Sequence, residues 1–138
     1  MPLRKNAKIE LIKSVPLFSH CTKKELAAIA TAADEVDLPA GKELAREGDR
    51  GREFCVIVEG IADVRRRGRR VNELGAGDFF GEIALITGGA RTATVTTTSP
   101  VRALVLTDRA FRSIVNSTPS VQGSVMKALA ERLHADAL

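Results

Sequence analysis

The sequence predicts an α+β fold in which a β-barrel or jelly roll lies between N-terminal and C-terminal helices. Three observations support this prediction. Apolar residues recur at helical spacing near both ends, short β-branched segments separated by glycine-containing turns fill the centre, and 138 residues suit one domain. We therefore expect a single domain over residues 1–138, with N-terminal helices over 1–34, the β-rich core over 35–107 and C-terminal helices over 108–138.

Two helices are expected before the β-rich core. A short one covers Lys8 to Lys13. For the second, Thr22 and Glu25 have the spacing of a capping box, in which a hydroxyl and a carboxylate satisfy the first N–H groups of a helix. Apolar residues at helical spacing follow from Leu26 onward, so we expect this helix from about Lys23 to Ala33.

Glycine-containing turns divide the central region into short segments that are rich in β-branched residues. Regularly spaced segments of this kind are typical of β-sandwiches and β-barrels. We expect strands at Phe54–Glu59, Ile61–Arg66, Arg70–Leu74, Ala93–Thr98 and Val101–Thr107.

Two helices are expected after the last strand. Asp108 is a candidate N-cap for a helix that reaches about Asn116. Thr118 and Pro119 would begin the next helix, because proline is tolerated at the first helical position.

Composition narrows the function classes. Tyrosine and tryptophan are absent and only five phenylalanines occur, which argues against a protein that stacks the bases of single-stranded nucleic acid. The net charge of +4 favours an anionic partner without deciding its class. No apolar run approaches the roughly 18 to 20 residues of a membrane span, so no membrane association is expected. Cys21 and Cys55 lie far apart in sequence, which is consistent with reduced thiols in the cytoplasm.

Two polar groups of residues have alternative interpretations. The run from Arg65 to Arg70 contains five arginines around Gly68 and could suggest nucleic-acid binding, but its place between two strands favours a solvated hairpin tip. The histidines and cysteines have no ligand spacing, so no metal site is expected.

The segment from Phe80 to Val95 carries the most chemical information. Gly81 lacks a Cβ, so a ligand or a tight turn can approach its backbone. Residues Glu82 to Ile86 would form one helical turn whose N–H groups make an anion site. The planar guanidinium of Arg91 matches two phosphate oxygens, and Glu82 could accept hydrogen bonds from sugar hydroxyls. The segment therefore predicts a ribose phosphate pocket.

This segment resembles the phosphate-binding cassette of the cyclic-nucleotide-binding family, written F-G-E-hydrophobic-A-L followed by a short turn and R-[AST]-A-[ST]-V. Residues 80–85 and 91–95 fill every position. The similarity extends through residues 48–60, 77–79, 108–111 and 129–133, which is most of the chain. It implies an eight-stranded β-barrel or jelly roll with the cassette at 80–95 and a C-terminal helical lid.

The resemblance also implies a role for each matching residue. Glu82 would hold the ribose 2′-hydroxyl, Gly81 would let the sugar approach, and Arg91 would pair with the exocyclic oxygens of the cyclic phosphate. The backbone N–H groups of Ile83 and Ala84 would donate to the phosphate, and the Thr92 hydroxyl would lie near the phosphate or the purine. Val64 and Val71 would contact the base, and Arg132 would cover it as a lid residue.

The function expected from these residues is a stand-alone, non-enzymatic sensor of cAMP or cGMP. Thr92 leaves the choice of nucleotide open, and we favour cAMP. Such a module would act on a protein effector in trans without binding DNA directly, and its C-terminal helix could pair with a second copy. One alternative is a structural or interaction domain of the same fold that binds no nucleotide. A cyclic phosphodiesterase is a third, which the sequence does not support because it offers neither a metal cluster nor an activated nucleophile.

Overall fold

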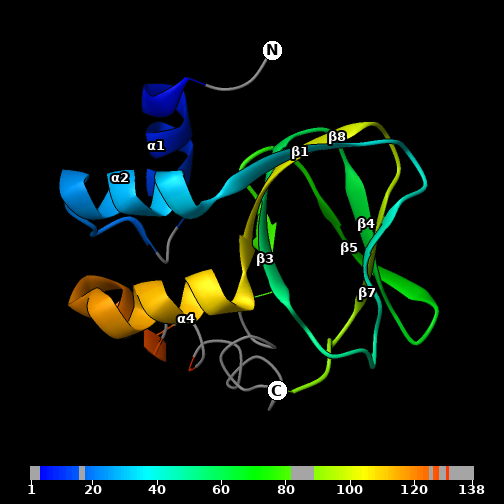
Figure 1. Ribbon diagram of the computed structural model, residues 1–138. Coiled ribbons are helices and arrows are strands. Elements are labelled where there is room, and N and C mark those ends of the chain that lie inside the picture. Colours follow the sequence, from blue (N-terminus) through cyan, green and yellow to red (C-terminus); the bar gives the residue numbers. More distant parts are fainter. Residues whose placement is uncertain (1–3, 16–17, 82–88, 125, 128–129, 131–138) are drawn as a thin grey trace.

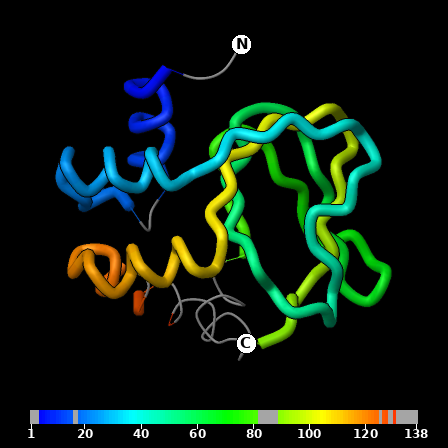
Figure 2. Tube along the Cα trace, viewed as in Figure 1, coloured from blue at the N-terminus to red at the C-terminus, as the bar shows by residue number. Residues whose placement is uncertain are grey.

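Figure 1 shows the computed structural model of the chain, which describes residues 4–15, 18–81, 89–124, 126, 127 and 130. Helices gather on one side and the strands form two sheets on the other (Figure 2). The elements in chain order are α1 (Lys5–Lys13), α2 (Lys23–Ala32), β1 (Asp34–Leu38), β2 (Glu43–Ala45), β3 (Glu53–Glu59), β4 (Ala62–Arg66), β5 (Arg69–Leu74), β6 (Phe79–Phe80), β7 (Thr94–Thr97), β8 (Val101–Thr107) and α4 (Asp108–Ser117).

The eight strands form two four-stranded sheets with antiparallel pairing. One sheet has the order β1-β8-β3-β6 and the other has the order β2-β7-β4-β5. Among the described residues no ladder joins the two sheets, so the predicted barrel or jelly roll takes the form of an open jelly-roll sandwich. The α+β prediction is confirmed.

Most predicted elements are present with small shifts at their ends. α2 begins with the predicted capping box, in which Thr22 accepts from the N–H of Glu25 and the Glu25 carboxylate accepts from the N–H of Thr22. All five predicted strands occur, and helical residues resume at Pro119 and continue over 119–124, here called the C-terminal helix. Strands β1, β2 and β6 were not predicted.

One capping prediction was wrong. The N-cap of α4 is Thr107 rather than Asp108, because Thr107 keeps the extended backbone of β8 and its hydroxyl accepts from the N–H of Ala110 at 3.2 Å. Asp108 lies one residue inside the helix, where its carboxylate still complements the positive end of the helix dipole.

Strands β3 and β8, at the centre of the sheet β1-β8-β3-β6, are covered on both faces. Along β3, Phe54 and Val56 point toward the helices, whereas Cys55 and Ile57 point into the sandwich. Successive strand residues face opposite sides, so a strand covered on both faces has a continuous apolar run. The sheet thereby separates two hydrophobic clusters.

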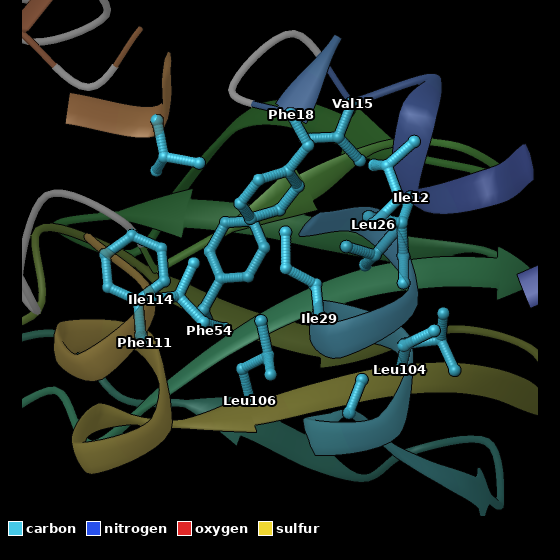
Figure 3. Packing of buried hydrophobic residues seen from close by; sticks show 14 residues of the cluster. Ile12, Val15, Phe18, Leu26, Ile29, Phe54, Leu104, Leu106, Phe111 and Ile114 are labelled. Atoms are coloured by element: carbon cyan, nitrogen blue, oxygen red, sulfur yellow. The ribbon is translucent and has the colours of Figure 1, made fainter. Parts of the chain in front are cut away.

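We call these clusters the helix-side core and the sandwich interior. The helix-side core joins α1, α2 and α4 to β3 and β8, and Phe54 lies near its centre (Figure 3). The Phe54 ring contacts those of Phe18, Phe79 and Phe111 at centroid distances of 5.9, 5.9 and 5.3 Å. The sandwich interior consists of smaller side chains: Ala45, Ile57, Ala62, Leu74, Val95, Val101 and Ala103.

Candidate functional site

Arg91 is buried between the end of one sheet and the loop that joins β2 to β3. The residue is only 8% exposed, and its Nη2 donates to the backbone carbonyl of Glu53 at 2.7 Å. Its Nη1 is also buried, and no partner for it exists among the described residues. The cation also lies 6.0 Å from the centroid of the Phe80 ring, within reach of a cation–π interaction. One end of the guanidinium is therefore anchored, and no described residue accepts from the donor at the other end.

The backbone of Arg91 is fixed as firmly as its side chain. Its N–H donates to the carbonyl of Asp49 at 2.7 Å, and its carbonyl accepts from the N–H of Gly48 at 2.9 Å. Arg50 forms an isolated antiparallel bridge with Ala90 immediately before it. The β2–β3 loop therefore positions the arginine, and β7 begins three residues later.

Gly81 lies against the Arg91 guanidinium and has a backbone that favours glycine. Its φ is +104°, a conformation that other residues rarely adopt. A Cβ at this position would lie 2.6 Å from Arg91 Nη1 and would collide with the Glu53 carbonyl. The close packing of Gly81 against Arg91 and Glu53 therefore requires a glycine here, whether or not a sugar also approaches it.

The next predicted residue, Thr92, is exposed, and its backbone carbonyl accepts from Arg66 Nε at 3.2 Å. This bond connects the β4–β5 hairpin to the segment before β7 that carries Arg91. Nothing in the sequence pattern pointed to the contact, because it joins residues that are 26 positions apart.

The two valines predicted to contact the base lie on neighbouring strands. Val64 in β4 is half-buried, packs against the sandwich interior and pairs with Asn72. Val71 in β5 is 54% exposed and lies where the β4–β5 ladder shifts register. They are therefore near one another in the sheet without being cross-strand partners.

The structure brings Gly81 and Arg91 together, places Thr92 in the segment just before β7, and places Val64 and Val71 on β4 and β5. The predicted helical turn, with Glu82, Ile83 and Ala84, lies outside the described residues, as does the candidate lid residue Arg132. Glu53 is a site residue that the sequence analysis missed. Its contribution is a backbone carbonyl, which every residue type possesses, so no sequence signal could have identified it.

A cavity of about 230 Å³ lies beside Arg91 on the side of the β2–β3 loop. Charged side chains predominate in its lining, which consists of Glu43, Leu44, Ala45, Arg46, Asp49, Arg50, Arg52, Glu53 and Arg91. The surroundings of the arginine are therefore polar and partly open.

Two observations bear on other kinds of chemistry. Burial, followed by the charge of Glu53, raises the pKa of the Cys55 thiol to about 12, while Arg91 acts in the opposite direction. This thiol therefore stays protonated at neutral pH. Within the described parts of the chain, no three His, Cys, Asp or Glu side chains converge as metal ligands, and no helix combines the length and apolarity needed to cross a bilayer.

Most of the chain matches one known protein family. The family model described as cyclic nucleotide-binding domain matches residues 35–118, which contain both sheets and α4. The chain belongs to this family. The resemblance seen in the cassette is thus confirmed at the level of the whole β-rich core.

The similarity of the chain to individual proteins supports its assignment to this family. A cyclic nucleotide-gated potassium channel of Rhizobium etli is 37% identical over 123 residues, covering 89% of this chain and 34% of the channel. The catabolite activator protein of Thermus thermophilus has a similar structure, with a TM-score of 0.80, 25% identity, and coverage of 88% of this chain and 60% of that one. The regulatory domain of Toxoplasma gondii PKA, solved with cAMP, also reaches a TM-score of 0.80, with 27% identity over 93% of this chain and 50% of that one.

The chain spans about a third of the curated channel that it resembles. Family and fold follow from these comparisons. The activities of the longer proteins belong to those proteins.

Proposed function

We propose that this chain is a regulatory module that binds a cyclic nucleotide, with cAMP as the favoured ligand. The observation that carries the proposal is the buried Nη1 of Arg91, which has no partner among the described residues. A buried charged donor without a partner costs roughly 1–3 kcal/mol or more, so an anion that accepted from it would bind favourably. A cyclic phosphate supplies such an acceptor.

The proposed roles of the surrounding residues rest on the family resemblance and, for Arg91 and Gly81, also on their positions. Arg91 pairs with the exocyclic phosphate oxygens, while its bond to the Glu53 carbonyl holds the guanidinium plane in place. Gly81 leaves room beside that plane. Glu82 holds the ribose 2′-hydroxyl, the N–H groups of Ile83 and Ala84 complete the phosphate site, and Thr92 adds a hydroxyl.

Recognition of the base involves the sheet and the C-terminal helix. Val64 and the exposed Val71 offer apolar surface to the purine, and Arg132 closes over it as part of a lid. A ligand shifts the balance between open and closed lids only by its difference in affinity for the two states. The signal therefore depends on contacts that form only after closure.

The module is proposed to act without catalysis, in the cytoplasm, on a protein effector in trans and without direct DNA contact. The C-terminal helix could also pair with a second copy. Met126 lies two residues after residue 124, and its apolar side chain, which is 68% exposed, would contribute to such a contact. Size-exclusion chromatography with and without cAMP tests the pairing, and an unchanged elution volume over a wide range of protein concentrations would contradict it.

Calorimetric titration with cAMP and with cGMP tests the proposed function. Arg91→Ala should weaken binding about tenfold to 150-fold, because a charge-assisted hydrogen bond contributes roughly 1.5–3 kcal/mol. Arg91→Lys should also weaken it, since an ammonium group cannot form the planar two-point contact. Arg112→Ala, which changes an exposed arginine on α4, is the matched control and should bind like wild type.

A second candidate function is a structural domain of the same fold that binds no nucleotide. The bond from Arg91 Nη2 to the Glu53 carbonyl supports it, because this bond alone gives the arginine a structural role. In that case both nucleotides would give flat titrations at millimolar concentration, and Arg91→Ala would lower only the stability.

A further inference from the structure

The turn between β4 and β5 concentrates positive charge at an exposed tip. Figure 1 shows this hairpin on the side of the molecule away from the helices. The ladder places Arg65 opposite Arg70 and Arg66 opposite Arg69, and Arg67 and Gly68 form the turn with φ values of +55° and +78°. We call residues Arg65–Arg70 the arginine hairpin. Like charges in directly opposed positions destabilise a β-ladder, so this arrangement carries a local cost.

Only part of this charge is neutralised by carboxylates. Arg65 pairs with Asp63 at 3.1 Å, and Arg70 pairs with Glu73. Within the described residues, Arg66, Arg67 and Arg69 have no ion pair. Arg67 is also the one described non-glycine residue with a positive φ, a conformation that usually favours glycine or asparagine. A hairpin that combines repulsion, unpaired charge and an unfavourable turn residue indicates a function that depends on its charge.

Hydrogen bonds connect the arginine hairpin to the segment that carries Arg91. Arg66 Nε donates to the Thr92 carbonyl at 3.2 Å, and the backbone N–H of Arg67 donates to Glu47 Oε1 at 2.8 Å. The N–H of Glu47 in turn donates to Thr94 Oγ1 at 2.9 Å. The charge of Arg66 is therefore held beside Thr92, and the backbone at the tip of the hairpin is connected through Glu47 to the start of β7.

From this placement we infer that the arginine hairpin attracts the anionic ligand electrostatically and speeds its entry into the site. This inference rests on the proposed function. The screening length at physiological ionic strength is about 8 Å, so exposed charges act mainly on a ligand that passes close to them. Arg66 Nε lies 3.2 Å from the carbonyl of Thr92, the residue that follows Arg91. Charges that line the approach to a site raise association rates by about tenfold to a thousandfold.

The hairpin acts on association more than on dissociation. Its side chains are exposed, so in the bound state water and salt screen their attraction to the phosphate. Arg91, by contrast, is buried and makes its contact after binding. The two groups of arginines thus have separable effects on the two rate constants.

Stopped-flow mixing with a fluorescent cAMP analogue that retains the cyclic phosphate tests this inference. The variant Arg67→Asn/Arg69→Gln removes two charges and keeps a residue that tolerates positive φ at the turn. At low salt its association rate constant should be about threefold to tenfold lower than that of wild type, with an unchanged dissociation rate constant. The difference should disappear near 1 M salt.

Two further variants identify charge as the cause. Arg67→Lys/Arg69→Lys keeps both charges and should associate at the wild-type rate. Lys23→Gln/Lys24→Gln removes two exposed charges from α2, among the helices on the other side of the molecule, and should also leave the rate unchanged.

An unchanged association rate in Arg67→Asn/Arg69→Gln at low salt would overturn the inference while leaving the proposed function intact. The absence of any binding signal from wild type would overturn both. If a labelled DNA duplex were retained by wild type and lost by this variant, with nucleotide association unchanged, the hairpin would belong to a nucleic-acid surface and the inference would be wrong.

Discussion

The helix-side core and the sandwich interior lie on opposite faces of the same sheet but are packed with side chains of different size. The helix-side core contains Phe18, Phe54 and Phe111, which are at most 1% exposed. Three of the seven buried residues of the sandwich interior are alanines. A cavity of about 310 Å³ also reaches into the sandwich, where Ala103, Val105 and Cys55 contribute to its lining.

This difference separates the part that stabilises the fold from the part that can accept change. Aromatic side chains bury the largest apolar areas and contribute most to core stability. Small side chains beside a cavity bury less area and leave room for side chains and ligands to move. Gly81 and Arg91 lie where the two regions meet, because a Cβ at Gly81 would lie 3.3 Å from Phe54 Cα and Arg91 Nη2 donates to the neighbouring Glu53 carbonyl. The room for change therefore lies in the sandwich interior, whereas the two site residues also contribute to the fold.

The largest expected effect tests the helix-side core. Phe54→Ala should lower the free energy of unfolding by about 3–5 kcal/mol, because it removes a ring that contacts three others. Urea denaturation followed by circular dichroism measures this change. A loss below about 1 kcal/mol would mean that this cluster does not dominate stability.

A matched pair of alanines within the sandwich interior tests whether the cavity leaves room for larger side chains. Ala62 and Ala103 are both buried strand residues. Of these two, only Ala103 lines the cavity of about 310 Å³. Ala62→Val should cost about 1–3 kcal/mol by overpacking. Ala103→Val should be neutral or stabilise by up to about 1 kcal/mol, because the added methyl groups enter the cavity. Equal losses in the two variants, measured by urea denaturation, would contradict the comparison.

The helices and five of the strands could be predicted because their signals are local. The capping box at Thr22 and the helical spacing after Leu26 lie within a single element, and so do the β-branched runs of β3 and β8. β1 could not be predicted in this way. It is an edge strand with the sequence DEVDL, and its pairing with β8 joins residues far apart in the chain.

The same distinction applies to the candidate site. Gly81 and Arg91 belong to one continuous motif, so the sequence could identify both. The Glu53 carbonyl and the Arg66 bond to Thr92 depend on how distant segments meet in space. A motif thus identifies the groups that touch a ligand, whereas the groups that hold them in place require the tertiary structure.

A smaller effect is expected where the C-terminal helix meets the N-terminal helices. Ser120 Oγ donates to Glu25 Oε1 at 3.2 Å, which connects the C-terminal helix to the start of α2. Ser120→Ala should lower the free energy of unfolding by about 1 kcal/mol, the usual contribution of one hydrogen bond. Ser124→Ala is the matched control. Among the described residues its hydroxyl bonds within its own helix, to the Ser120 carbonyl, so its loss should be close to neutral. Thermal unfolding distinguishes the two, and equal shifts in Tm would refute the connection.

The smallest expected effect concerns two carboxylates, Glu25 among the helices and Asp37 in the sandwich. Hydrogen bonding from the backbone N–H of Thr22 lowers the pKa of Glu25, and Arg102 lowers the pKa of Asp37 through a hydrogen bond at 2.8 Å. Because both pKa values lie below their unfolded values, each group stabilises the fold above its unfolded pKa. That contribution is lost as the pH falls through the folded pKa.

The two carboxylates differ in the cause of the shift, and salt should separate them. Screening weakens the attraction between Asp37 and the Arg102 cation, so the pKa of Asp37 should rise toward its ordinary value at 1 M salt. The Glu25 bond is to a neutral backbone N–H, so its pKa should stay low. NMR titration of the two carboxyl carbons at low and high salt measures both values. If both pKa values responded equally to salt, a capping hydrogen bond could not be the main cause of the pKa shift at Glu25. The pKa of the carboxylate among the helices would then depend on nearby charges as much as that of Asp37 in the sandwich does.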